Sequence, residues 1–132
     1  MTSSYMPKSK SDTHITPDRV YEMIESIWGY KQDELFDPCP VDATFDGLDT
    51  YWAPVNYVSP PYTLLKEFVD KAFMEADNYH YKSIMLLPSK TDQQWFHNII
   101  ARGSEIKWIR KRLKFKNNKW SATQPHFLVM IK

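Results

Sequence analysis

The stretch Ser59-Pro60-Pro61-Tyr62 holds the residues of this chain best suited to chemistry on an exocyclic aromatic amine. The Ser59 hydroxyl and the Pro60 carbonyl are neighbouring hydrogen-bond acceptors, and the fixed φ of the prolines keeps that carbonyl aimed. Two acceptors that hold both hydrogens of an amine would draw its nitrogen toward tetrahedral geometry and localise its lone pair. Neither acceptor has to be a strong base, because the amine can lose its proton after it attacks an electrophile.

Tyr62 adds a flat surface beside these acceptors. A nucleobase stacked on an aromatic ring gains roughly 1–3 kcal/mol, and a base of duplex DNA must leave the helix to reach such a pocket. The residue types therefore favour methyl transfer onto a nucleobase amine. A rigid connection from a strand into a helix, with Tyr62 packed on the surface, explains the same residues without chemistry.

Three helices are predicted around this stretch. Thr16 is suited to cap the first helix, and Pro17 is suited to its first turn. The third helix begins with a capping-box pair, Thr91 and Gln94. The second has the most regular pattern of apolar residues at helical spacing. The predicted helices cover residues 16–29, 63–79 and 91–102.

Short apolar or alternating segments predict five strands. Residues 83–88 form a continuous apolar run, as in a strand covered on both faces. Because helices alternate with apolar strands, we expect a three-layer α/β fold with a mostly parallel sheet. The last two strands should form a β-hairpin, with a turn at Asn117 and Asn118. The predicted strands cover residues 34–40, 54–58, 83–88, 105–110 and 126–132.

Polar segments follow three successive predicted strands. They are residues 37–40, 59–62 and 88–91. Ligands of open α/β sheets lie beyond the carboxyl ends of the strands. If these strands are adjacent and parallel, the three segments line one crevice.

Positive charge is concentrated between Arg102 and Lys119. This segment holds eight Lys or Arg side chains and one acid, whereas the rest of the chain holds nine basic and fifteen acidic side chains. The net charge of the whole chain is only +1. A local basic block suits the phosphate backbone of a nucleic acid, and it equally suits a solvated hairpin with ordinary surface lysines.

Length and composition indicate one soluble globular domain. The 132 residues can bury one core, and no apolar stretch approaches the roughly 20 residues of a membrane span. Residues 1–13 are polar and lack the apolar core of a signal peptide, so we expect a disordered tail before a single domain over residues 14–132. One cysteine and four scattered histidines predict no metal site. The single cysteine, which allows no internal disulfide, fits a reducing cytoplasm.

Three further side chains have either two possible roles or a purely structural one. Trp95 follows a polar loop, so a base platform and a core position are both open for it. Trp120 is expected to pack within the hairpin. His126 flanks the last strand and is expected to be structural or exposed.

Five segments, in the same order, resemble the phage-type, Dam-like family of DNA N6-adenine methyltransferases. TPDRVYEMI resembles the family's opening Thr-Pro helix, and FDPCP followed by DGL matches its Asp-Pro-Cys and Asp-Gly-Leu signatures. SPPYT matches its catalytic Asn-Pro-Pro-Tyr-Ser. MLLPSKTDQQWFHN matches Leu-Leu-Pro-x-(Lys/Arg)-Thr-Asp-x-x-Trp-Phe, and RLKF matches Gly-Arg-(Leu/Ile)-x-Phe. The likeness runs from about Thr16 to the last residues.

The resemblance implies S-adenosylmethionine as the methyl donor, DNA as the partner, a reduced Rossmann-like methyltransferase fold and a place in the cytoplasm of the cell or of a phage's host. Only about 20 residues separate Asp37 from Ser59, too few for the two extra strand–helix units of a larger methyltransferase. A sheet of about five strands is therefore expected. Its exposed edge would allow pairing with a second chain as a homodimer.

The resemblance also implies roles for individual residues. Those that would hold the target amine and base are Ser59, Pro60, Pro61 and Tyr62. Those that would form the donor site are Thr16, Pro17, Asp37, Pro38 and Cys39. Those that would contact DNA are Lys90, Thr91, Trp95, Arg110, Lys111, Arg112 and Lys114.

Three departures from the family pattern leave alternatives open. Ser59 replaces the usual Asn, and Ser-Pro-Pro-Tyr also occurs in methyltransferases that act on cytosine N4. Lys111 stands where the family usually has Gly. No glycine-rich donor loop follows the first predicted strand, although the small family lacks that loop too. A cytosine-N4 methyltransferase and a catalytically inactive nucleic-acid-binding module therefore stand beside the adenine enzyme.

Overall fold

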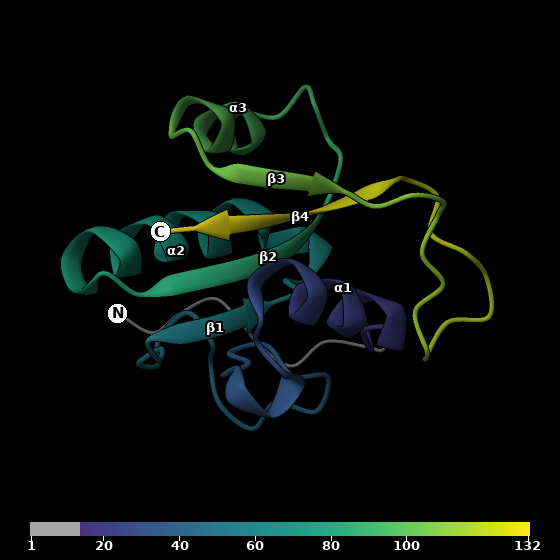
Figure 1. Ribbon diagram of the computed structural model, residues 1–132, viewed down its shortest axis with the longest axis horizontal. Helices are drawn as coiled ribbons and strands as arrows, with labels where there is room; N and C mark the ends of the chain where they lie inside the picture. The colour runs from purple at the N-terminus through teal and green to yellow at the C-terminus, as the bar shows by residue number, and fades with distance from the viewer. Residues whose placement is uncertain (1–13) are drawn as a thin grey trace.

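A four-stranded sheet forms the centre of the molecule (Figure 1). The computed structural model describes residues 14–132, so the tail expected over residues 1–13 lies outside the described part. In spatial order the strands are β1 (Val55–Val58), β2 (Lys82–Pro88), β4 (His126–Ile131) and β3 (Glu105–Trp108). The helices are α1 (Asp18–Trp28), α2 (Leu65–Tyr79) and α3 (Gln94–Ala101).

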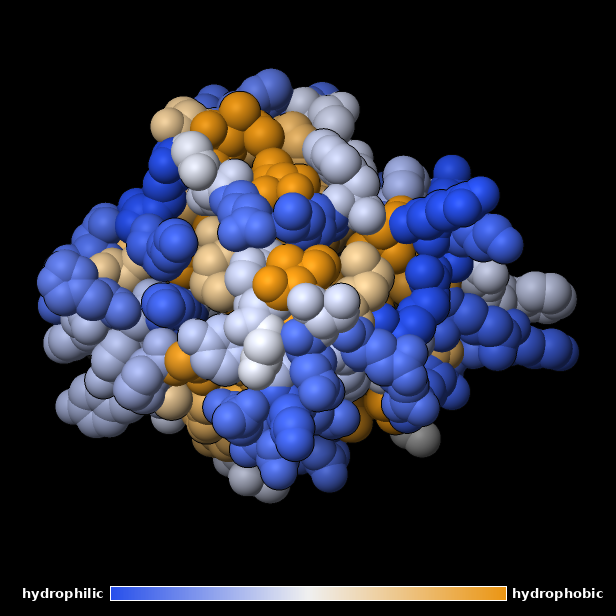
Figure 2. All heavy atoms as spheres, viewed as in Figure 1, coloured by the Kyte–Doolittle hydropathy of each residue, from blue (hydrophilic) through white to orange (hydrophobic). Residues whose placement is uncertain are grey.

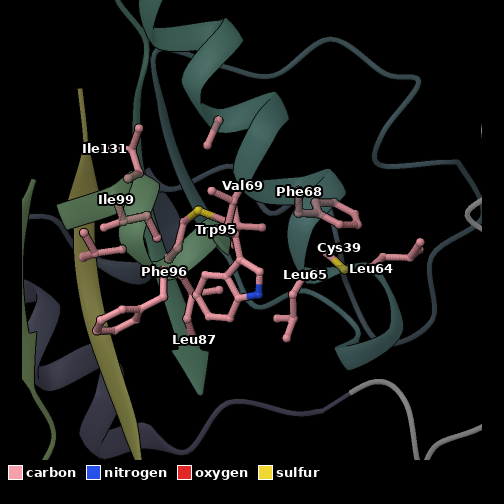
Figure 3. Close-up of a cluster of buried hydrophobic side chains, with 14 of the residues drawn as sticks. Cys39, Leu64, Leu65, Phe68, Val69, Leu87, Trp95, Phe96, Ile99 and Ile131 are labelled. Carbon is pink, nitrogen blue, oxygen red and sulfur yellow. The ribbon is translucent and has the colours of Figure 1, made fainter. Parts of the chain in front are cut away.

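Helices cover both faces of this sheet, which confirms the three-layer arrangement. On one face, Val20 and Ile24 of α1 pack against alternate residues of β2 and β4. On the other face, α2 and α3 bury a larger apolar cluster against the intervening residues (Figure 3). Because β2 is covered on both sides, six of its seven residues are buried, as its continuous apolar run predicts.

The expectation of a mostly parallel sheet is wrong. Only β1 and β2 pair in parallel, whereas β2 with β4 and β4 with β3 pair antiparallel. The reason is the place of β4, which inserts between β2 and β3 and runs against both. Strands β1, β2 and β3 still point the same way, so their carboxyl ends meet at one edge of the sheet.

The strand expected over residues 34–40 is reduced to a single bridge. Phe36 pairs in parallel with Asn56, through Phe36 N to Val55 O at 3.1 Å and Tyr57 N to Phe36 O at 2.9 Å. A 3₁₀ turn (Gln32–Glu34) precedes this bridge, and Pro38, which cannot donate to a ladder, follows it. The bridge nevertheless places Asp37 beside the carboxyl end of β1.

Both predicted capping interactions at helix starts are wrong. Helix α1 begins at Asp18 after Pro17, and the Thr16 hydroxyl bonds the Tyr57 hydroxyl instead of the helix. Helix α3 begins only at Gln94, without a side-chain cap, because a turn from Lys90 to Gln93 precedes it.

The predicted end of α1 agrees with the structure, and the predicted pairing of the last two strands agrees in part. Gly29 ends α1 in a left-handed conformation, with φ at 82°. Strands β3 and β4 pair as the predicted hairpin would, but the long segment 109–125 connects them in place of a tight turn. None of the helices in the described residues has both the length and the apolar character that a membrane span requires.

Candidate active site

Side chains from three separate segments meet on the α1 side of the sheet, at the carboxyl end of β1. The Thr16 Oγ1 and Tyr57 Oη atoms lie 2.6 Å apart, and the Tyr21 and Tyr57 rings lie 5.1 Å apart. Because side chains alternate along a strand, Ser59 faces the same side as Tyr57, and it lies near enough to the Tyr57 hydroxyl to oppose the rise in the pKa of Tyr57. Tyr57 thus links the segment before α1 to the loop after β1.

Asp37 is the ionisable group at the centre of this cluster. Burial raises its pKa to about 6, and the hydrogen bond from Cys39 N–H to Oδ1, at 2.8 Å, opposes the rise. Its negative charge in turn adds to the effect of burial in raising the pKa of Tyr21 and Tyr57. The fold therefore holds a carboxylate here at an electrostatic cost.

The loop around Asp37 is supported from behind by Gly47. A Cβ on Gly47 would lie 2.0 Å from the Pro38 carbonyl oxygen, so no other residue fits without moving the Asp37-Pro38-Cys39 loop. The Gly47 carbonyl accepts a hydrogen bond from Trp52 Nε1 at 2.9 Å, which fixes this contact. The Asp-Gly-Leu sequence thus positions the Asp-Pro-Cys sequence, a relation that the spacing alone did not reveal.

The proline loop places Tyr62 at the surface and the prolines inside. Pro60 and Pro61 are buried and Ser59 is half-buried, whereas Tyr62 keeps 37% of its surface exposed. A 3₁₀ turn (Tyr62–Leu64) follows, closed by Leu64 N to Pro61 O at 3.0 Å. Burial of part of the ring raises the pKa of Tyr62 to about 12, so its hydroxyl stays protonated.

Two hollows open on either side of Tyr62. The more apolar one has a volume of about 310 Å³ and lies between Tyr62, Phe115 and the segment 118–124. Gln124 also lines this hollow, and its Oε1 is buried beside it without a hydrogen-bond partner among residues 14–132. The other hollow, about 230 Å³, runs from Tyr62 toward Lys90 and Trp95.

One model of a protein family matches residues 3–127, and its description is DNA N-6-adenine-methyltransferase (Dam). The chain belongs to this family. The match confirms the resemblance that the five motifs indicate and supports DNA as the kind of substrate. No curated protein and no solved structure matches the chain.

The family motifs come together in space, although they are spread along the sequence. Thr16, Asp37 and Ser59 meet around Tyr57, as described above, and Pro17 directly precedes α1. Pro38 and Cys39 are buried, so Cys39 offers backbone more readily than its thiol. The donor-site and base-site residues expected from the motifs thus adjoin one another.

Four of the five basic residues expected to contact DNA lie on the segment between β3 and β4, which is mostly hydrophilic in Figure 2, and the fifth, Lys90, follows β2. Arg19 of α1 anchors this segment by donating to the carbonyls of Arg110 and Lys111, at 3.0 and 3.4 Å. Lys111 has φ at 66°, in the left-handed region that favours the glycine usual in the family. The four side chains left exposed are Arg110, Lys111, Arg112 and Lys114.

The aromatic residues around the site are arranged differently from the expectation. Trp95 is 5% exposed and packs among Leu87, Val69 and other core residues, with little surface to offer a base (Figure 3). Trp120, which was expected to pack in the hairpin, is 75% exposed and lines the larger hollow. Lys90 is half-buried and Thr91 exposed at the mouth beyond β2.

Sequence reasoning missed His126 as a site residue. It is 1% exposed, and its Nε2 lies 2.7 Å from the Tyr62 hydroxyl. No sequence signal predicts this contact, because His126 and Tyr62 are far apart in the chain and meet only when β4 enters the middle of the sheet.

Proposed function

We propose that this protein methylates the exocyclic amine of adenine in DNA, with S-adenosylmethionine as the donor and Ser59–Tyr62 as the loop that holds the extruded base. One observation carries the proposal: the partly buried carboxylate of Asp37 and the side chain of Ser59 lie around the same tyrosine, Tyr57. Direct transfer of a methyl group requires the donor site and the acceptor site to be adjacent. Asp37 on the donor side and Ser59 on the acceptor side meet this requirement.

The residues on the donor side suit a cationic molecule with hydroxyl groups. S-adenosylmethionine would supply a methyl group activated by a positively charged sulfur. Burial makes ionised Asp37 costly in the free protein, and a neighbouring positive charge or hydroxyl donor would offset that cost. Thr16 and Pro17 border the same space from the start of α1, and the Cys39 N–H keeps the carboxylate in place.

The residues on the target side suit an amino base. Ser59 Oγ and the Pro60 carbonyl would accept the two amine hydrogens, and Tyr62 would stack on the ring. Gln124 lines the larger hollow, and its buried Oε1, which has no partner among the described residues, would become a further acceptor if its side chain turned toward a bound base. Adenine and cytosine both present an amine, whereas thymine presents only a carbonyl at that position, and the family description favours adenine.

The exposed basic side chains after β3 would bind DNA phosphates on the same side of the molecule. Lys116 Nζ, 2.6 Å from Asp18, and Arg19 tie this basic segment to the start of α1, and hence to the donor side. Contacts of this kind release counterions and supply affinity without reading sequence.

The test is incubation with labelled S-adenosylmethionine and separate oligonucleotides in which adenine or cytosine is the only amino base offered, followed by mass spectrometry of the nucleosides. We expect N6-methyladenine. Ser59→Ala should lower turnover by about 100-fold, as removal of one group that stabilises developing charge does elsewhere. Ser104→Ala, directly before β3, is the matched control and should keep full turnover. An intact fold that yields no methylated base contradicts the proposal.

A second candidate is a nucleic-acid-binding module without catalysis. The observation in its favour is that Ser59 interacts with Tyr57 in the free protein. Calorimetry with S-adenosylhomocysteine separates the two functions: measurable binding supports the enzyme, and DNA binding without it supports the module.

A further inference from the structure

We propose that His126 is a positioning residue that fixes the Tyr62 ring before a base arrives. This inference rests on the proposed function for its consequence, since it assigns Tyr62 to a base, but the contact itself can be tested without any substrate. His126 lies outside every motif that relates this chain to its family.

The direction of the hydrogen bonds follows from the partners. His126 Nδ1 lies 3.2 Å from the Gln124 carbonyl oxygen, which can only accept, so Nδ1 carries the proton. On a neutral ring Nε2 is then an acceptor, and the Tyr62 hydroxyl, 2.7 Å away, must donate to it. Tyr62 cannot rotate its hydroxyl away without losing this bond.

The imidazole stays neutral near pH 7. Burial lowers the pKa of His126 to about 4, and the positive charges of His14 and Arg112 act in the same direction. The hydrogen bond to the Gln124 carbonyl opposes the shift only in part. Nε2 therefore keeps its lone pair for the protonated Tyr62 hydroxyl at every pH between about 4 and about 12.

The two partners differ in how firmly they are held. His126 begins β4, with its carbonyl bonded by Ile109 N at 3.2 Å and its ring 5.6 Å from that of Phe115. The preceding residue, Pro125, accepts from Ser89 N at 2.8 Å, so β4 and β2 are joined at this point. Tyr62 is more exposed and lies on a short 3₁₀ turn. The rigid strand therefore fixes the side chain on the loop.

A ring that is fixed in advance loses less conformational freedom when a base stacks on it. Immobilising one side chain on binding is a recognised cost, and removing the hydrogen bond should restore that cost. We expect binding of a single-stranded adenine oligonucleotide, which needs no base flipping, to weaken by about 3- to 10-fold.

Two amide substitutions separate the hydrogen bond from packing. His126→Gln can place an amide oxygen near the position of Nε2 and still accept from Tyr62. His126→Asn can keep the bond to the Gln124 carbonyl but is too short to reach Tyr62. We expect the Gln variant to bind a single-stranded oligonucleotide containing 2-aminopurine almost as the native protein does. The Asn variant and Tyr62→Phe should both bind it more weakly, and the double variant no more weakly than either.

NMR of the free protein tests the contact itself. We expect a His126 ring protonated at Nδ1 at pH 7, a slowly exchanging Tyr62 hydroxyl proton, and faster motion of the Tyr62 ring in the Asn variant. Equal ring motion in native and Asn variants overturns the proposal, as do additive binding losses or equal losses for Gln and Asn. If the NMR result holds and the native protein binds no oligonucleotide, the positioning stands and the proposed function fails.

Discussion

The two ends of β1 both bury polar groups, but they treat them in opposite ways. Near its amino end, Asn56 is 0% exposed, and its side-chain amide pairs with both the N–H and the carbonyl of Ala53, each at 2.8 Å. At its carboxyl end, Asp37 is held at a raised pKa and Gln124 Oε1 is left unpaired among the described residues. Satisfied polar groups mark a structural role, whereas costly ones mark a place where a ligand is expected.

Asn56→Ala should have the largest effect on stability. The change removes the buried Asn56 amide and leaves the Ala53 N–H and carbonyl without partners in a partly buried position, so the free energy of unfolding should fall by about 3 kcal/mol. Urea denaturation measures this. Asn78→Ala, on the exposed face of α2, should change it little. A loss below about 1 kcal/mol for Asn56→Ala would remove the contrast between the two ends.

Asp37→Asn should raise the free energy of unfolding, in contrast to Asn56→Ala. The folded pKa of about 6 lies above the unfolded value of 3.8, so the contribution of Asp37 to stability falls as pH rises through this window and stays low above it. Asn carries no charge, and at pH 8 the variant should therefore be more stable by about 2 kcal/mol.

Denaturation at pH 4 and pH 8 tests this, with Asp42→Asn, an exposed carboxylate, as the control. The gain should nearly vanish at pH 4. Binding of S-adenosylhomocysteine by Asp37→Asn should be lost even though the protein is more stable. Equal stability of native protein and variant at pH 8 would contradict the account of Asp37.

Two residues with left-handed backbone conformations extend the comparison between the two ends of the strands. His80 (φ 60°) ends α2 near the amino end of β2, and Lys111 (φ 66°) follows the carboxyl end of β3. Either change to Gly should raise stability by about 1 kcal/mol, because Gly adopts this conformation without strain. Thermal unfolding measures both changes. Only Lys111→Gly should weaken DNA binding, so an equal effect of both on DNA would show that this edge is not special.

The smallest expected effects concern individual phosphate contacts. Arg112→Ala and Lys114→Ala should each lower the slope of log affinity against log salt by about 0.9. Titrations at several salt concentrations give the slope. Lys66→Ala, whose partner on α2 is Asp70 at 2.6 Å, should leave it unchanged. A similar drop in the salt slope for Lys66→Ala would show that DNA does not bind specifically at the basic segment after β3.

The sequence was sufficient to predict most of the helices and strands and the family motifs. It was insufficient where a group finds its hydrogen-bond partner on a distant segment. Apolar periodicity located α2, β2 and β4 to within a few residues. The Thr16 hydroxyl was expected on its own helix, but Tyr57 takes it from across the sheet. Local spacing contains no information about such a partner.

The order of the strands could not be predicted from the sequence, and the surroundings of the proposed site depend on it. Placing β4 between β2 and β3 reverses the expected pairings and brings His126 to Tyr62. It also leaves segment 109–125 long enough to expose Trp120, whereas α3 carries Trp95 into the core. The motifs predict the loop of the proposed site from sequence alone, but which aromatic rings surround that loop depends on this topology.

The insertion of β4 also has a consequence for assembly of the sheet. In the described structure β3 pairs with β4 alone, so it cannot join β1 and β2 until residues 126–131 are in place. Strand β3 therefore joins the sheet only after β4, the last of these strands along the chain, has been synthesised. Loss of that short segment would split the fold into two halves with unpaired backbone facing each other, and would remove the imidazole beside Tyr62 at the same time.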